Sequence, residues 1–368
     1  MKKFTGPDAN VLSLWARGAD KSVKPAFVCN RPYNSVSINK YGNCFPCICE
    51  GWLPYSIGSV FDYNSLDELF NNPHAEIVQQ DVDNKKFTWC AVDSCGINYH
   101  DQLDSVYNLW ITVDPSCNLM CPSCRRQKVM WSEGPNFRLG TKIVEKIMYW
   151  LEKFDKPITI NITGDGDPLA SHIFRPMVKV YQPKPNQTLR LQTNGLLIKK
   201  ILPDTPFLKN IVNYSISIDA ASKHVYENVR RPGKWENLIE NLDWLKQTID
   251  LKLSNPDKVL LNFVVQKSNF RDIPALAQLA EHYGFIGALM ELINWHTWSM
   301  DADGTEWTQQ NGIFSDHNVL DKNHPDHEEC MQLIHRVSNH SNITVNPHVK
   351  KILAERVGFE PTEDLHPR

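Results

Sequence analysis

The sequence lacks a strong charge of either sign, a long apolar run and any low-complexity tract. Its 39 lysines and arginines nearly balance its 42 aspartates and glutamates, for a net charge of -3, so charge gives no case for nucleic acid or an anionic membrane as a partner. The longest clean apolar runs, such as 259–265, are far too short to span a bilayer. Residues 1–20 hold no sustained apolar stretch, so we expect no signal peptide. These absences predict a cytoplasmic protein without a membrane partner.

Cysteine, in contrast, is plentiful, with ten in 368 residues. Disulfides rarely persist in the cytoplasm, so clustered thiols indicate metal or redox chemistry. Cys330 stands alone and is expected to be a small buried hydrophobe. The other nine form an early group and a tight later trio: Cys29, Cys44, Cys47, Cys49, Cys90 and Cys95, then Cys117, Cys121 and Cys124.

From residue 106 onward, strand-like and helix-like segments alternate. Six apolar or β-branched runs have the length of strands covered on both faces, namely 106–113, 157–163, 188–193, 211–218, 258–265 and 288–293. Helical stretches lie between them, at 141–154, 172–181, 235–249 and 272–283. Six β–α repeats predict parallel strands with right-handed crossovers, either an open α/β sheet or a partial (β/α)6 TIM-like barrel. Chemistry in such folds gathers at the carboxyl ends of the strands.

The composition divides the chain into three parts. Residues 1–104 are rich in Pro, Gly, Asn and Cys and lack the apolar mass for a core of their own, which favours a small metal-stapled module. Residues 105–300 form the predicted barrel, and residues 301–368 form a polar C-terminal extension.

The trio Cys117, Cys121 and Cys124 follows the first predicted strand of the barrel. A structural zinc site needs four ligands, and this loop supplies three. Three thiolates can instead hold three irons of a [4Fe–4S] cluster and leave the fourth iron open for a small chelating ligand. A zinc knuckle that recruits a distant fourth ligand is the alternative.

This C-x3-C-x2-C loop after a first barrel strand resembles the signature of radical S-adenosylmethionine (SAM) enzymes. Further segments are similar to motifs of that family, and they appear in the family's order: TGDGDPLAS (163–171), QTNG (192–195), YSISIDAAS (214–222) and YENVRRPGKWENLIENL (226–242). The resemblance covers about residues 105–300. It implies a [4Fe–4S] cluster on the cysteine trio and SAM as the ligand of the open iron.

The resemblance also implies which residues contact SAM. From the residues alone, the GDGD turn can present backbone N–H groups and carboxylates to an amine, although it could be a simple βα turn. Ser217 and Asp219 share one strand face, where a serine could equally form an internal hydrogen bond. Of two adjacent arginines, Arg230 is preferred to Arg231. The expected cofactor contacts are Gly164, Asp165, Gly166, Asp167, Asn194, Ser217, Asp219 and Arg230.

The first hundred residues resemble the SPASM/twitch module that holds auxiliary iron–sulfur clusters, here placed before the barrel rather than after it. The resemblance implies an auxiliary [4Fe–4S] cluster on Cys29, Cys47, Cys90 and Cys95. Cys44 and Cys49 are spare thiols that could replace one of these ligands. A zinc-ribbon-like staple is the alternative.

Taken together, the resemblance implies a radical SAM oxidoreductase or modifying enzyme. Its expected partners are SAM, a reductant such as flavodoxin or ferredoxin, and a peptide or protein side chain as substrate. A dehydrogenase of a small alcohol or aminosugar is the close alternative, and a non-catalytic zinc-stapled binding protein is the alternative from another class. Nucleic-acid modification is disfavoured by the acidic net charge. The histidines His296, His324 and His327 are expected to be solvated loop residues rather than catalytic ones.

Overall fold

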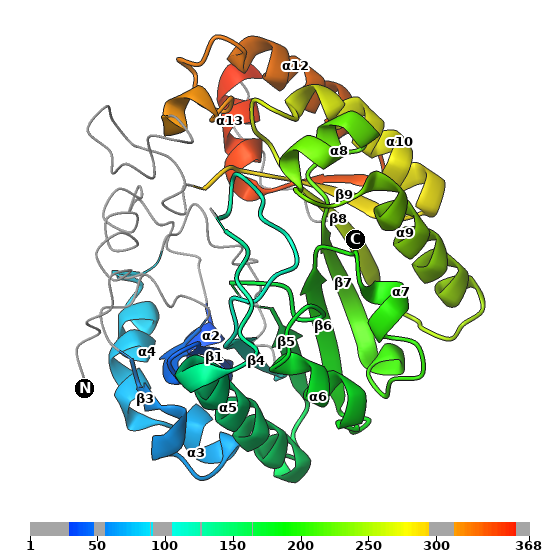
Figure 1. Cartoon of the computed structure of the whole chain (residues 1–368). Coiled ribbons are helices and arrows are strands. Elements are labelled where there is room, and N and C mark those ends of the chain that lie inside the picture. Colours follow the sequence, from blue (N-terminus) through cyan, green and yellow to red (C-terminus); the bar gives the residue numbers. More distant parts are fainter. Residues whose placement is uncertain are drawn as a thin grey trace.

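The computed structural model centres on one mixed sheet of ten strands (Figure 1). The residues that the structure describes are 29–47, 56–88, 90, 105–125, 127–163, 165–293 and 313–357. The strands lie in the order β10-β9-β8-β7-β6-β5-β4-β1-β2-β3, and among the described residues the two end strands do not pair with each other. The sheet is therefore open, as expected for a partial barrel.

The six predicted barrel strands are all present, and each runs parallel to the next. They are β4 (Tyr107–Thr112), β5 (Ile158–Ile162), β6 (Gln187–Thr193), β7 (Ile211–Ser217), β8 (Lys258–Val264) and β9 (Ile286–Met290). The last strand begins two residues earlier than the apolar run 288–293 suggested. The predicted α/β class with parallel strands is confirmed.

The helices between these strands also match the prediction, with some additions. They are α5 (Gly134–Lys153), α6 (Phe174–Val180), α7 (Ile198–Ile201), α8 (Lys223–Val229), α9 (Trp235–Asp250) and α10 (Ile273–Tyr283). Helix α5 begins at Gly134 rather than at residue 141, and the short α7 and α8 were not anticipated. In α9, Leu238, Leu242 and Leu245 are buried on one face, as their spacing predicted.

The N-terminal segment joins the same sheet. Strand β1 (Ser35–Asn39) runs parallel to β4, and β2 (Asn43–Pro46) and β3 (Gly58–Ser59) extend the edge in antiparallel fashion. Val36 and Ile38 belong to the same apolar core as the barrel strands. Around this edge lie α2 (Arg31–Asn34), α3 (Leu66–Phe70), α4 (Glu76–Asp83) and the 3-10 turns Val60–Asp62 and Pro73–Ala75.

The C-terminal segment is more ordered than its polar composition suggested. Helix α12 (His327–Ser338) packs on α10, strand β10 (Ile343–Val345) pairs in parallel with β9, and α13 (Pro347–Val357) follows. Cys330 on α12 is fully buried, as expected. Three further 3-10 turns complete the described chain: Leu208–Asn210, Phe270–Asp272 and Phe314–Asp316.

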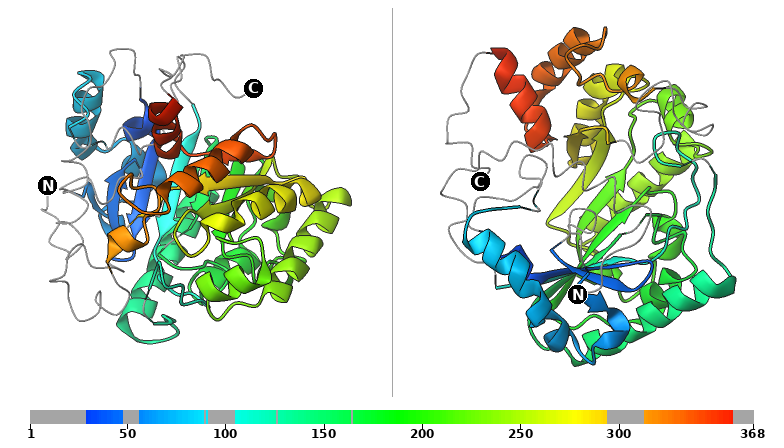
Figure 2. Two further views of the ribbon diagram at one scale, coloured as in Figure 1. Left: turned by 90° about the horizontal axis from the view of Figure 1, so that it is seen from above. Right: turned by 90° about the vertical axis from the view of Figure 1, so that its left-hand side faces the viewer.

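The two faces of the sheet differ in chemistry because side chains alternate along each strand. One face carries apolar side chains such as Ile160, Leu191 and Ile216, which are buried in the core that the helices share. Figures 1 and 2 show helices α5, α6, α9 and α10 along the outer side of the curved sheet. The other face, which we call the inner face, is polar from β1 to β7. In the described part of the chain, no helix combines the length and the apolar character needed to cross a membrane.

Candidate functional site

The cysteine trio lies in the loop that leaves the carboxyl end of β4, where chemistry is expected in such a fold. Cys117 and Cys121 are buried, and Cys124 is exposed. Burial raises the pKa of the Cys121 thiol to about 11, Arg230 opposes the shift, and the neighbouring Cys124 adds to it. The thiols are therefore close enough to affect one another electrostatically. Metal binding would displace their protons, since the thiolate is the ligand.

The first half of this loop is fixed by buried hydrogen bonds. The backbone N–H of Ser116 donates to Asp114 Oδ1 at 2.9 Å, and the N–H of Trp131 donates to Ser116 Oγ at 2.7 Å. The Ser171 hydroxyl donates to the other oxygen of Asp114. The N–H of Cys117 donates to the carbonyl of Val129 at 2.9 Å. The loop is thus held in place before any metal binds.

The glycine-rich segment after β5 packs directly on the cysteine loop. A Cβ atom at Gly166 would lie 2.2 Å from the carbonyl oxygen of Ser116, far inside any real contact, so a side chain there would push the two loops apart. The N–H of Asp167 donates to that same carbonyl at 2.7 Å. Gly164, the first glycine expected to contact SAM, lies outside the described residues.

Asp167 is used inside the protein. Its Oδ2 accepts hydrogen bonds from the hydroxyl of Thr193 at 2.8 Å and the N–H of Asn194 at 2.6 Å. Its Oδ1 accepts from the N–H groups of Leu169 and Ala170. Burial raises the pKa of this carboxyl, and the four hydrogen bonds oppose the shift. Both oxygens are occupied, so Asp167 holds the loop after β5 against the loop after β6.

Asn194, at the end of β6, contacts the cysteine loop through its side chain. Its amide nitrogen lies 3.8 Å from Cys117 Sγ and donates to Asn118 Oδ1 at 2.8 Å. Its own Oδ1 accepts from the N–H of Leu196 at 3.1 Å. An N–H donor aimed at a thiolate lowers the charge on the sulfur, which is a known lever on the potential of an iron–sulfur cluster.

Arg230 approaches the second cysteine. Its Nη1 lies 3.7 Å from Cys121 Sγ, and its Nη2 lies 2.6 Å from Asp219 Oδ2. Burial lowers the pKa of Arg230, but Asp219 and Cys121 raise it well above the ordinary value, so the guanidinium stays charged. Arg231 points away and donates to the carbonyl of Asn228. Of the two adjacent arginines, Arg230 is therefore the one at the site.

Asp219 and Ser217, expected on one face of β7, differ in their surroundings. Asp219 has a left-handed backbone with φ of 51°, and its Oδ1 accepts from the N–H of Val264 at 2.9 Å. With Arg230 on Oδ2, both oxygens of Asp219 are engaged. The Ser217 hydroxyl is half-buried and makes no hydrogen bond among the described residues. Ser217 is thus the group of the two that remains available to a ligand.

Two basic residues at this site were not identified from the sequence. Arg125 donates to the carbonyl of Pro115 at 2.6 Å and to the carbonyl of Asp165. Lys40, in the turn between β1 and β2, lies 3.1 Å from Asp165 Oδ2. Arg125 is adjacent to the last cysteine of the trio, which could have signalled its role. Lys40 is 125 positions away from Asp165 in the sequence, so no local sequence pattern predicts that the two residues meet.

The donor set fits an iron–sulfur cluster. Three cysteine thiols lie on one loop. Asn194 directs an N–H donor at the first of their sulfurs, and Arg230 directs one at the second. The buried Nε of Arg230 has no hydrogen-bond partner among the described residues, which leaves a positive donor beside the trio. Among the residues that the structure describes, no group of three or more His, Cys, Asp or Glu side chains is arranged to hold a single metal ion.

The expected auxiliary ligands are described in part. Cys29 and Cys90 pack against the same small apolar cluster, formed by Val82 and Phe87. Cys47 follows β2, is buried and has a left-handed backbone with φ of 64°. Cys95 and Cys49 lie outside the described residues. Cys44 belongs to the main apolar core of the sheet, and its thiol donates to the carbonyl of Gly42 at 3.8 Å, so we assign it no ligand role.

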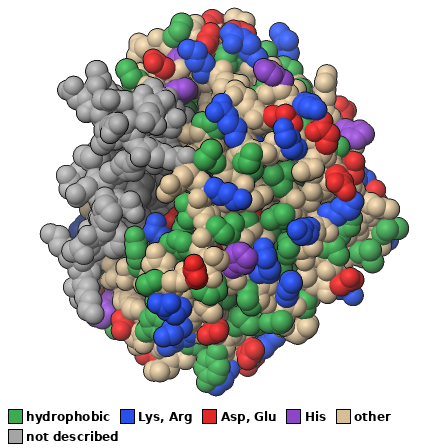
Figure 3. All heavy atoms as spheres, viewed as in Figure 1, with side chains coloured by type: hydrophobic (Ala, Val, Ile, Leu, Met, Phe, Trp, Pro, Cys, Tyr) green, Lys and Arg blue, Asp and Glu red, His purple; other side chains and the backbone are tan. Residues whose placement is uncertain are grey.

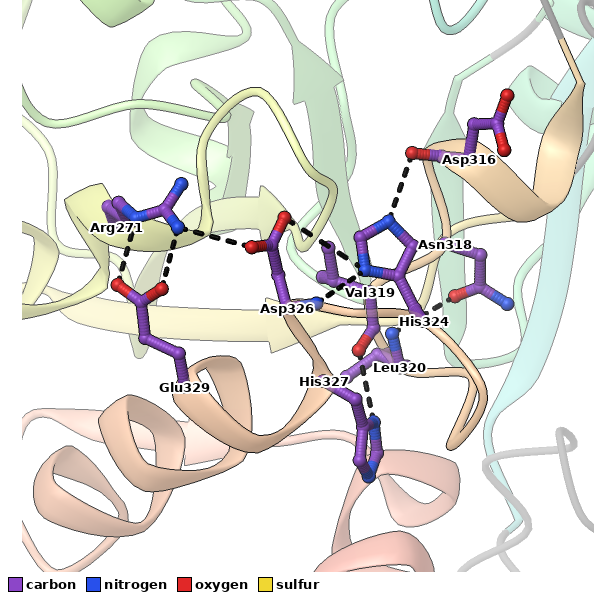
Figure 4. Close-up of polar contacts among 9 residues, drawn as sticks. All are labelled: Arg271, Asp316, Asn318, Val319, Leu320, His324, Asp326, His327 and Glu329. Atoms are coloured by element: carbon purple, nitrogen blue, oxygen red, sulfur yellow. Dashed lines mark hydrogen bonds and ion pairs between the residues drawn. The ribbon is translucent and has the colours of Figure 1, made fainter.

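The C-terminal histidines are structural where they are described (Figure 4). His324 was expected to be solvated, and this is wrong because its ring is buried. Its Nδ1 accepts from the N–H of Asp326 at 3.0 Å, and its Nε2 lies 3.1 Å from the carbonyl oxygen of Asp316. His327 lies 3.1 Å from the carbonyl of Val319. His296 lies outside the described residues.

The fold and this loop define a class: an open α/β barrel whose first strand delivers a three-cysteine cradle suited to an iron–sulfur cluster. Comparison with known families is consistent with that class. Residues 111–280 match the radical SAM superfamily, and residues 29–96 match the iron–sulfur cluster-binding domain called SPASM. The chain therefore carries a radical SAM domain with an SPASM domain ahead of it, which confirms the resemblance seen in the sequence. The radical SAM domain implies a [4Fe–4S] cluster that works with SAM, and the SPASM domain implies an auxiliary iron–sulfur cluster. Members of the radical SAM superfamily are enzymes.

Three curated relatives are similar over part of the chain. A probable GTP 3′,8-cyclase of Methanocaldococcus jannaschii is 27% identical over 192 residues, covering 51% of this chain and 59% of the relative. The FeMo cofactor biosynthesis protein NifB of the same organism is 28% identical over 35% of this chain and 44% of the relative. An AdoMet-dependent heme synthase of Methanosarcina barkeri is 27% identical over 46% of each chain. The chain thus spans about half the length of the curated relatives it matches.

Among solved structures, two of SuiB of Streptococcus suis align with this chain. The form bound to the precursor peptide SuiA aligns with a TM-score of 0.43 and 14% identity, over 90% of this chain and 76% of that one. The form bound to S-adenosylmethionine aligns with a TM-score of 0.41 and 13% identity, over 85% and 72%.

Proposed function

We propose that this chain is a radical SAM oxidoreductase or modifying enzyme that acts on a peptide or protein side chain. One observation carries the proposal: the cysteine loop is packed on the glycine-rich segment through Gly166, while Asn194 and Arg230 direct N–H groups at Cys117 and Cys121. A zinc staple does not require two such donors aimed at its sulfurs.

Cys117, Cys121 and Cys124 would hold the [4Fe–4S] cluster, with one iron left to SAM. When bound, the cluster and SAM supply reductive cleavage to a 5′-deoxyadenosyl radical, which abstracts hydrogen from the substrate. The chain's own share is to position these groups and to exclude water. The two N–H donors stabilise negative charge on the sulfurs, so they make the cluster easier to reduce.

Around SAM, the expected residues divide into two groups. Ser217 and Asp165 would contact SAM directly, because the Ser217 hydroxyl makes no hydrogen bond among the described residues and Asp165 is exposed beside its ion pair with Lys40. Gly164 and Gly166 are proposed as further contacts on the resemblance of their segment to the family's glycine-rich motif. Asp167, Asp219, Asn194 and Arg230 act on SAM through the loops they hold. Both carboxylates, the side-chain amide of Asn194 and the two Nη atoms of Arg230 are engaged within the protein.

The N-terminal segment would hold the auxiliary [4Fe–4S] cluster through Cys29, Cys47, Cys90 and Cys95. That cluster would accept an electron from the substrate radical, so that the net reaction is an oxidation. We assign residues 1–104 to this module, 105–300 to the barrel and 301–368 to the extension. Both boundaries fall in stretches that the structure does not describe.

The peptide substrate is proposed because the first hundred residues resemble the SPASM/twitch module. Dehydrogenation of a small alcohol or aminosugar is the second candidate. On the face seen in Figure 3, lysine, arginine, aspartate and glutamate are intermingled, without the basic stripe that nucleic acid requires. We propose a cytoplasmic setting with flavodoxin or ferredoxin as reductant.

Anaerobic reconstitution with iron and sulfide, followed by SAM and dithionite, tests the reaction class. We expect 5′-deoxyadenosine from the parent protein and none from Cys121→Ala. Cys330→Ala is the matched control, because Cys330 is buried as Cys121 is but lies on the buried face of α12, away from the cysteine loop. Colourless protein that binds zinc and makes no 5′-deoxyadenosine would instead support the non-catalytic zinc-stapled binding protein.

A further inference from the structure

Strand β1 comes from the N-terminal segment, but it lies in the sheet as the parallel neighbour of β4 (Figure 1). The paired stretch ends with Asn39 opposite Thr112, so the carboxyl ends of the two strands lie side by side. The cysteine loop leaves β4 at this edge of the sheet, and Lys40 is the first residue after β1 at the same edge. Functional side chains of parallel sheets gather at the carboxyl ends of the strands. Lys40 therefore has the position of a site residue.

The turn that carries Lys40 is held by its own hydrogen bonds. The side chain of Asn39 is buried, and its Oδ1 accepts the N–H groups of Tyr41 and Asn43, each at 3.0 Å. The N–H of Gly42 donates to the carbonyl of Asn39 at 2.9 Å, and Gly42 supplies the left-handed backbone of the turn, with φ of 79°. The backbone of Lys40 is therefore fixed before any ligand binds.

Lys40 reaches from this turn to the glycine-rich segment after β5. Its Nζ lies 3.1 Å from Oδ2 of Asp165, and the two side chains are 26% and 54% exposed. The second carboxylate oxygen of Asp165, Oδ1, makes no hydrogen bond among the described residues. Asp165 therefore has one oxygen occupied by Lys40 and one oxygen that can accept a hydrogen bond from a ligand.

The backbone of Asp165 is fixed against the cysteine loop. Arg125, the residue after the last cysteine of the trio, donates both to the carbonyl of Asp165 and to the carbonyl of Pro115. The next residue, Gly166, packs so closely on the carbonyl of Ser116 that a side chain would not fit between them. The cysteine loop thus fixes the backbone of Asp165, and Lys40 holds its carboxylate.

A carboxylate that is held in this way is suited to an amine. An ionised carboxylate only accepts hydrogen bonds, and an ammonium group is its strong charge-assisted donor. An exposed aspartate without a partner would lose rotamer freedom when it bound an amine, and that loss would weaken binding. Because Lys40 already holds Oδ2 of Asp165, part of this ordering is complete before a ligand arrives. The ion pair is therefore a preorganising contact for whatever amine binds at Oδ1.

We propose that Lys40 is a positioning residue of the SAM site, whose ammonium holds the Asp165 carboxylate so that Oδ1 accepts the amine of SAM. This inference rests on the proposed function, because it takes SAM to be the ligand beside the cysteine trio. It gives the N-terminal segment a role in SAM binding, in addition to its auxiliary cysteines. The affinity for SAM then depends on a residue that lies outside the barrel motifs.

The test measures binding of radiolabelled SAM to the whole reconstituted chain by anaerobic equilibrium dialysis, without reductant. Lys40→Met should raise the dissociation constant about fivefold, the upper range for a partly exposed ion pair, at unchanged iron content. Lys40→Arg should restore most of the affinity, because a guanidinium can bind the same carboxylate oxygen. Lys156→Met is the matched control and should bind SAM as the parent does. Lys156 also pairs with an aspartate, Asp67 at 2.6 Å, but it lies just before the amino end of β5.

A double variant shows whether Lys40 acts through Asp165. In an Asp165→Ala background the Lys40→Met change should have no further effect on SAM binding, since no carboxylate is left to position. Additive losses would mean that Lys40 contacts SAM directly, and they would overturn the proposal. An unchanged dissociation constant in Lys40→Met, or an equal loss in Lys156→Met, would overturn it too. Each of these results can occur while the parent protein still forms 5′-deoxyadenosine, so the role of Lys40 can fail without the proposed function. A parent protein that neither binds SAM nor forms 5′-deoxyadenosine would overturn both.

Discussion

The guanidinium of Arg230 lies 2.6 Å from the carboxylate of Asp219, and both side chains are largely buried, at 12% and 4% exposed. The same guanidinium donates toward Cys121 Sγ at 3.7 Å. Asp219 in turn accepts the N–H of Val264 from β8. One ion pair thus links the end of β7, the neighbouring strand β8 and a proposed cluster ligand.

The Arg230–Asp219 pair should therefore be costly to break from one side. Arg230→Met leaves a buried carboxylate without its partner and should lower the free energy of unfolding by about 3–5 kcal/mol. The double variant Arg230→Met with Asp219→Asn should recover much of that loss, since the uncompensated charge is gone. Urea unfolding monitored by circular dichroism measures both. A double variant as unstable as the single one would contradict this account of the pair.

The amide of Asn194 should tune the proposed cluster. Asn194→Ala removes the N–H donor 3.8 Å from Cys117 Sγ but keeps the backbone N–H that binds Asp167. The reduction potential of the cluster should fall, by on the order of tens of millivolts. Redox titration followed by electron paramagnetic resonance measures it. Asn186→Ala, which alters an asparagine remote from the site, should leave the potential unchanged, and a fall of equal size there would argue against a local effect.

Gly166 should tolerate no side chain. In Gly166→Ala the new Cβ would lie 2.2 Å from the carbonyl oxygen of Ser116, a backbone atom that cannot move away by a rotamer change. The two loops must separate, so the iron content after reconstitution should fall several-fold. Gly284→Ala is the control, because its Cβ meets nothing within 4 Å and its left-handed backbone should cost only about 1 kcal/mol. Full iron content in Gly166→Ala would show that the close approach is not needed.

Cys330 should make the protein sensitive to alkali. Burial raises the pKa of its thiol from 9.0 to about 12, so the folded state favours the protonated form. Its contribution to stability is complete below pH 9 and is lost as the pH rises toward 12, by about 1.4 kcal/mol per pH unit. Cys330→Val, similar in volume, lacks this loss.

The measurement is urea unfolding of both proteins at pH 8 and pH 10. The parent protein should lose about 1 kcal/mol more than Cys330→Val between these values. Equal losses in the two proteins would mean that the thiol ionises in the folded state as readily as in the unfolded one.

The strand pattern was predictable because it is local. In Ile158–Ile162, alternate residues are isoleucine, and the isoleucines lie under the helices while Thr159 and Asn161 face inward. The start of α5 at Gly134 was missed, because the seven residues before 141 are mostly polar or small and show no apolar period. In the structure Phe137 and Leu139 pack against the core and Gly140 is buried, contacts that come from the tertiary fold and not from a local apolar period.

The site was predictable in its residue types and less so in its contacts. Arg230 could be named from its motif, but the sequence could not separate it from Arg231, since only the turn of the chain after α8 decides which points inward. Asp167 was expected at the cofactor, whereas the structure shows both of its oxygens bound by Thr193, Asn194 and the next backbone N–H groups. The bonds from Thr193 and Asn194 join residues 26 and 27 positions apart in the sequence, so no local sequence pattern predicts them.

The sequence by itself determined the class of the fold and the position of the cysteine trio, because apolar alternation and the spacing of three thiols act within a few residues of one another. Only the tertiary structure decided that β1 joins the barrel beside β4, and that Ser37, Asn161 and Arg190 meet in one row. These relationships join residues far apart in the chain. They depend on the register between strands, and a single strand does not encode that register alone.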